Sequence, residues 1–156
     1  MSKKLPIITI ITGLLIGTIP MRPVNAREIN QYYFCASLLT KAGISDAKAA
    51  SSCAEALYPN ELHNCVTGIK KVTPIPGNEA LSACQRVRRP LELGYCVSQI
   101  NYLNQENVAL SVLDYCRRSL LPKQFAQCVV GLRKKIKSPT TRLMEDCISA
   151  NDSLKK

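Results

Sequence analysis

The chain has 156 residues, among them 21 Lys and Arg, 11 Asp and Glu, eight cysteines and one histidine. This length suits one domain, and the lone histidine together with the lack of any C-x-x-C pair excludes the usual zinc and dithiol redox motifs. The positive charge is uneven, because residues 27–85 carry as many acidic as basic residues, whereas residues 86–156 carry thirteen basic and six acidic ones.

Residues 1–26 have the features of a signal peptide. Two lysines precede an apolar stretch from Leu5 to Pro20, and the small residues Val24 and Ala26 occupy the positions that a signal peptidase recognises. The apolar stretch is shorter than the roughly 20 residues of a membrane-spanning helix. We therefore expect cleavage after Ala26, export to the periplasm or the cell exterior, and a single mature domain over 27–156 without a transmembrane segment.

The eight cysteines alternate between long and short intervals, with successive steps of 18, 12, 19, 12, 20, 12 and 19 residues. They are Cys35, Cys53, Cys65, Cys84, Cys96, Cys116, Cys128 and Cys147. This period predicts four repeats of 30–32 residues, at about 28–58, 59–89, 90–121 and 122–153, in which each unit buries its apolar face against the next.

Apolar residues flank the cysteines at helical spacing, which predicts two amphipathic helices in each repeat. Three positions before the first cysteine of each repeat stand Tyr32, Leu62, Leu93 and Phe125, and three before the second stand Ala50, Leu81, Leu113 and Met144. We expect these side chains in the core. A proline follows the second cysteine by six positions in three repeats, at Pro59, Pro90 and Pro122, where it suits the first turn of the next helix.

The expected fold is all-α, with helices near 28–41, 46–57, 59–71, 78–89, 90–103, 107–120, 122–136 and 139–150. Four helical hairpins would stack as a short α-solenoid, with a closed eight-helix bundle as the alternative. In an exported chain the even cysteine count indicates disulfides. Pairing within hairpins (Cys35–Cys53, Cys65–Cys84, Cys96–Cys116, Cys128–Cys147) leaves no cysteine over. Pairing across the proline turns (Cys53–Cys65, Cys84–Cys96, Cys116–Cys128) uses Cys35 and Cys147 only in a closed bundle, so we favour the first scheme.

The segments from Cys84 to Cys96 and from Cys116 to Leu132 resemble those of a family of exported cyanobacterial proteins. The likeness follows the cysteine spacing over essentially the whole mature chain. It implies a compartment and a lineage, but no activity. The layout is also similar to the disulfide-stapled helical repeats of Sel1-like cysteine-rich proteins, as an analogy of architecture.

Basic residues are the best candidates for function. One expected ladder comprises Arg86, Arg88, Arg89, Arg117 and Arg118, and a cluster on the opposite edge comprises Arg133, Lys134 and Lys135. Both sets fall near expected helix ends, so they either only compensate helix dipoles or form an anion-binding surface.

No catalytic constellation is apparent, and we expect His63 on the surface or the flank of a helix. We therefore expect no enzymatic activity, no cofactor and no metal. The leading hypothesis is an exported interaction module that binds an acidic protein, an anionic polysaccharide or lipid headgroups, and no nucleic acid. The alternatives are a structural envelope protein without a defined ligand, and an enzyme or enzyme inhibitor that uses a groove between helices.

Overall fold

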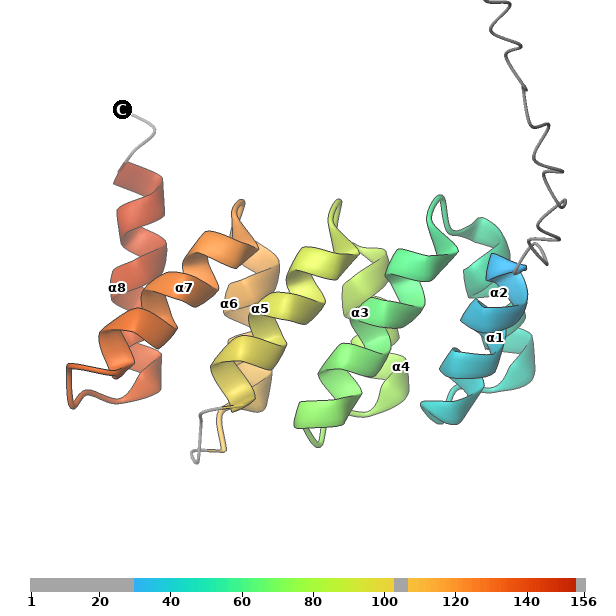
Figure 1. Cartoon of the computed structure of the whole chain (residues 1–156), viewed down its shortest axis with the longest axis horizontal. Helices are drawn as coiled ribbons and strands as arrows, with labels where there is room; N and C mark the ends of the chain where they lie inside the picture. The colour runs from blue at the N-terminus through green and yellow to red at the C-terminus, as the bar shows by residue number, and fades with distance from the viewer. Residues whose placement is uncertain (1–29, 103–106, 154–156) are drawn as a thin grey trace, which may run out of the picture.

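A computed structural model describes residues 30–102 and 107–153, so the expected signal peptide lies outside the described residues (Figure 1). Within these two ranges the chain forms helices and no strand, which confirms the all-α class. The helices are α1 (Gln31–Lys41), α2 (Asp46–Glu55), α3 (Pro59–Val72), α4 (Gly77–Gln85), α5 (Pro90–Tyr102), α6 (Ala109–Arg118), α7 (Pro122–Arg133) and α8 (Thr140–Ser153). None of these helices is both long and apolar enough to cross a membrane.

The helices form an open row of four hairpins. The odd-numbered helices pack side by side, α1 on α3, α3 on α5 and α5 on α7, while each even-numbered helix packs on its hairpin partner. Figure 1 shows the α1–α2 hairpin at one end of the row and the α7–α8 hairpin at the other. The arrangement is therefore the short α-solenoid, and the closed bundle is wrong.

Each hairpin is held by one disulfide between its two helices. The bonds join Cys35 to Cys53, Cys65 to Cys84, Cys96 to Cys116, and Cys128 to Cys147. The paired Cα atoms lie 5.9 to 6.0 Å apart, within the range of ordinary disulfides. Pairing within hairpins is confirmed, and pairing across the proline turns is wrong. Four such bonds are typical of a protein in an oxidising compartment.

Local sequence sets most of the helix ends. Pro59, Pro90 and Pro122 each begin a helix, where the missing N–H has no intrahelical partner to lose. The Oδ1 atom of Asn30 caps α1 by accepting hydrogen bonds from the backbone N–H of Tyr32 and Tyr33. Helix α4 ends at Gln85, four residues before the expected end, with Arg86 as its C-cap.

The core is formed by the apolar residues at helical spacing, and two expected core residues of the first repeat are exceptions. Leu62, Leu93 and Phe125 are buried as expected, but the equivalent Tyr32 is 49% exposed. Helix α1 is the first described helix of the row, so it has a packing neighbour on one flank only. Ala50 is exposed as well, because α2 turns Ala49 toward the core in its place.

Candidate anion-binding site

The three turns that lead into Pro59, Pro90 and Pro122 lie along one edge of the solenoid, which we call the proline edge. They join α2 to α3, α4 to α5 and α6 to α7, and they form the upper edge in Figure 1. Since the helices of a hairpin run antiparallel, every even-numbered helix that leads into such a turn ends at this edge and every odd-numbered helix begins there. Residues at equivalent places in successive turns are thereby brought into one line.

A groove with a volume of about 310 Å³ lies between the α4–α5 turn and the α6–α7 turn. It is lined by the five residues of the expected ladder, Arg86, Arg88, Arg89, Arg117 and Arg118. Leu93 and Cys116 also line it, and no acidic residue is found among its described lining residues. We call this feature the arginine groove. The fold thus brings two arginine clusters, 28 or more residues apart in the chain, to one place.

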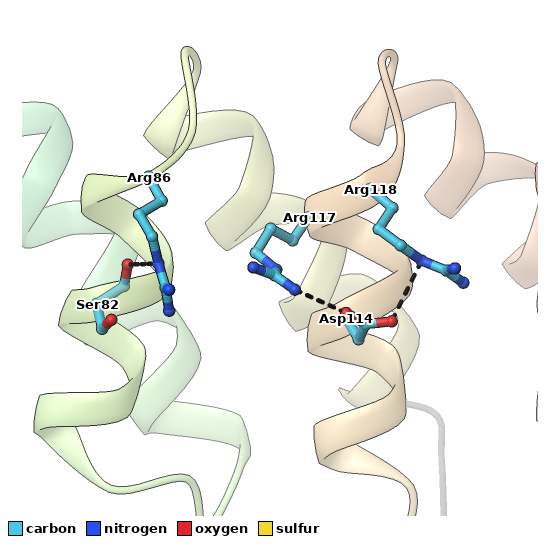
Figure 2. A network of polar contacts seen from close by, with 5 residues as sticks. All are labelled: Ser82, Arg86, Asp114, Arg117 and Arg118. Carbon is cyan, nitrogen blue, oxygen red and sulfur yellow. Dashed lines mark hydrogen bonds and ion pairs between the residues drawn. The ribbon is translucent and has the colours of Figure 1, made fainter.

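Arg86 is the C-cap of α4, and Arg88 lies in the turn that follows. The Nε atom of Arg86 donates a hydrogen bond to the carbonyl oxygen of Ser82 over 3.0 Å, and Figure 2 shows the side chain lying along the helix toward Ser82. Arg88 is exposed in the turn and has no ion pair with another described residue. Its charge is therefore not offset by a carboxylate in contact with it.

Asp114 of α6 holds the two arginines on the other side of the groove. Its carboxylate lies 2.9 Å from Arg117 and 3.2 Å from Arg118, and Figure 2 shows the two guanidinium groups on either side of it. The guanidinium carbon of Arg118 also stands 4.7 Å from the centre of the Tyr115 ring, a cation–π contact. One carboxylate facing two arginines leaves a net positive charge.

Helix dipoles explain only part of this cluster. Arg117 and Arg118 occupy the last turn of α6, where a cation is favourable. Arg88 and Arg89 follow the end of α4 and directly precede α5, whose N-terminus carries the positive end of the dipole. Arg89 has Glu92 at 3.5 Å to offset its charge. Dipole compensation therefore accounts for the pair on α6 and the ion pair with Glu92 for Arg89, which leaves Arg88 unexplained.

The second expected cluster lies at the opposite edge and does not join the arginine groove. The Nη1 atom of Arg133 donates to the carbonyl oxygen of Ile100 over 3.5 Å, which ties α7 to the end of α5. Lys134 caps the C-terminus of α7, and both Lys134 and Lys135 are exposed. The structure gives Arg133 a packing role and leaves the two lysines on the surface.

A neighbouring groove of about 490 Å³ repeats the arrangement one unit earlier, between the α2–α3 and α4–α5 turns. It is lined by Glu55 as well as by Arg88, so its charge is mixed. The exposed Leu57 and Tyr58 line it too, and sequence reasoning missed them. The available signal was their position, since they directly precede Pro59 and thus fall in a turn, outside the helical stripe.

His63 is buried, so the expected surface position is wrong, and burial leaves the other expected position, the flank of a helix, standing. It is 6% exposed, and its Nδ1 atom has no hydrogen-bond partner among the described residues. Helix α3 lies between α1 and α5, so both of its flanks are covered. Burial lowers the pKa of His63 below its ordinary value. The described chain has no group of three or more His, Cys, Asp or Glu placed to hold a metal ion.

Comparison of the chain with protein-family models, with curated proteins and with solved structures gives no match. The resemblance to exported cyanobacterial cysteine-repeat proteins rests on the cysteine spacing and two short segments, and it stays a prediction.

Proposed function

We propose that the protein is an exported, non-enzymatic interaction module that binds an anionic partner through the arginine groove. The observation that carries this proposal is the convergence of five arginines on one groove without an acidic lining residue. Dipole compensation does not account for Arg88, which directly precedes the N-terminal end of α5 with no ion pair to a described residue, whereas a binding role does. The four disulfides and the signal-like residues 1–26 support a location in the periplasm or outside the cell.

Arginine suits this task because its planar guanidinium presents paired N–H donors that match carboxylate, sulfate or phosphate oxygens. Acidic proteins, anionic polysaccharides and lipid headgroups all offer such groups. The lining residues Leu93 and Cys116 belong to the buried core, so the groove has a rigid floor on which the arginines are arranged. Preorganisation of this kind lowers the entropy lost on binding.

The test measures binding of the exported, oxidised protein to a soluble acidic polymer, polyglutamate, across a range of salt concentrations. The variant Arg86→Gln/Arg88→Gln/Arg117→Gln removes three charges from the groove. At about 0.5 kcal/mol for each exposed contact, this loss corresponds to roughly tenfold weaker binding at low salt. The salt dependence should also become shallower, because fewer charge contacts remain to be screened.

The matched control, Lys134→Gln/Lys135→Gln/Lys137→Gln, removes the same number of charges from the opposite edge. Binding by this control should stay within about twofold of the wild type, well under the tenfold change expected at 1.4 kcal/mol. Equal weakening by both variants would show a response to net charge alone. Absence of salt-dependent binding by the wild type would favour the structural alternative, an envelope protein without a defined ligand.

A further inference from the structure

Two turns of the proline edge expose apolar side chains to solvent. In the α2–α3 turn Leu57 is 82% and Tyr58 60% exposed, and in the α6–α7 turn Leu120 is 64% and Leu121 41% exposed. Side chains of this size are costly to leave in water. Neither pair belongs to the apolar residues at helical spacing that form the core. Packing within the repeat therefore does not explain why these positions are apolar.

The apolar pairs occupy equivalent places in the repeats. Leu57-Tyr58 precede Pro59 and Leu120-Leu121 precede Pro122, while Arg88-Arg89 stand in the same two positions before Pro90. Along the edge the turns therefore read apolar, basic, apolar. Because the three turns lie in one row (Figure 1), a flat partner can contact all of them at once, whereas a small ion reaches only one groove.

We propose that the anionic partner is a membrane surface rich in acidic phospholipids, on which the proline edge docks. This inference rests on the proposed function and names its partner. The arginine groove binds headgroup phosphates, and Leu57 and Leu120 enter the apolar layer just below them. Tyr58 suits the boundary between the two layers, because its ring is apolar and its hydroxyl polar.

A soluble polyanion would satisfy the arginines but leave the leucines in water. A bilayer surface offers both parts at fixed relative depth, phosphate groups outside and acyl chains beneath. The edge offers both kinds of group as well, since the arginine groove lies beside exposed apolar side chains of the turns and does not surround an enclosed apolar pocket.

The opposite edge provides a matched control surface. It also exposes apolar residues, among them Leu110 and Ile136, and it carries the lysines that follow α7. Acidic residues stand in first turns of helices at both edges, Asp46 and Glu79 here and Glu61 and Glu92 at the proline edge, so they do not distinguish the two. Arg133, in contrast to Arg88, is bonded to the backbone of a neighbouring helix, α5. The exposed residues there are not paired at equivalent places before a proline.

The experiment uses the exported, oxidised protein and vesicles of phosphatidylglycerol and phosphatidylcholine in equal parts, with pure phosphatidylcholine vesicles for comparison. The variant Leu57→Ser/Leu120→Ser should bind the anionic vesicles at least tenfold more weakly and bind polyglutamate as the wild type does. The control Leu110→Ser/Ile136→Ser should bind both as the wild type does. Thermal melts followed by circular dichroism check that each variant is folded.

The depth of insertion has its own reporter, since the sequence contains no tryptophan. In Tyr58→Trp the fluorescence should move to shorter wavelength on anionic vesicles and be quenched by brominated acyl chains. In Tyr102→Trp, at the opposite edge, it should not change.

The outcomes separate the two proposals. Binding to polyglutamate without binding to anionic vesicles overturns the membrane inference, leaves the proposed function standing and points to an acidic protein or polymer. Binding to neither probe overturns both. Vesicle binding that survives Leu57→Ser/Leu120→Ser, or that is lost in the opposite-edge control, also overturns the docking of the proline edge.

Discussion

Gly94 in α5 lies directly against the backbone of Cys65 in α3. A Cβ atom at Gly94 would stand 3.0 Å from the Cα atom and 3.3 Å from the carbonyl oxygen of Cys65. Close by, the Ser98 hydroxyl donates a hydrogen bond to the carbonyl oxygen of Gly68 over 3.1 Å. These contacts define the crossing of α3 and α5, where two neighbouring repeats meet backbone to backbone.

We expect Gly94→Ala to destabilise the protein by about 1–3 kcal/mol, because the added methyl group meets backbone that cannot rotate away. Gly131→Ala is the matched control, since Gly131 is also in a helix and a Cβ there meets nothing within 4 Å. The control should be neutral or stabilise by up to about 1 kcal/mol through helix propensity. Chemical denaturation of both variants measures the difference, and equal stabilities would contradict the close crossing.

Reduction of the disulfides should remove most of the stability. Each bond joins cysteines 18 to 20 residues apart, which corresponds to about 3 kcal/mol by the chain-entropy account. Four such contributions are comparable to the whole 5–15 kcal/mol of a typical domain. After reduction and thiol blocking, circular dichroism should show that the protein has lost its fold at room temperature and that no cooperative melt remains on heating. A melt that matches that of the oxidised protein would show that core packing suffices.

Stability should fall as the pH is lowered through the ordinary pKa of histidine. Burial lowers the pKa of His63 in the folded state, so below about pH 6.5 the unfolded chain binds a proton that the folded chain does not. The loss begins near that ordinary value and levels off below the lowered pKa of the folded state. Denaturation between pH 8 and pH 5 should show a smaller decrease in His63→Leu than in the wild type. Identical pH profiles would show that folding does not lower the pKa of His63.

Asp114 should weaken anion binding, because it neutralises part of the charge of Arg117 and Arg118. Asp114→Asn should cost about 0.2–1 kcal/mol of stability, the range for exposed ion pairs, while polyglutamate binds more tightly. Arg88→Gln should show the opposite pattern, an unchanged melting temperature with weaker binding, since Arg88 lacks an ion pair among the described residues. If Arg88→Gln lowers stability but leaves binding intact, the groove has only a structural role.

The hairpins and their disulfides follow from sequence spacing. Each helix carries one cysteine at a matched distance from the proline turn, and in an open row only one bond per hairpin uses all eight cysteines. Helical stripes and prolines likewise act within a few residues, so most helices begin and end near the expected positions. The early end of α4 at Gln85 is the largest departure.

Contacts between repeats were decided by the tertiary structure alone. The residues two positions before the first cysteine are Tyr33, His63, Gly94 and Ala126, which differ in size and polarity and show no pattern in the sequence. The last three are buried, whereas Tyr33 is 68% exposed because α1 has only α3 beside it in the row of odd-numbered helices.

The arginine groove was also decided by the tertiary structure. Sequence supplied five arginines near helix ends, but their convergence, their pairing with Asp114 and Glu92, and the apolar turns beside them depend on how neighbouring hairpins stack.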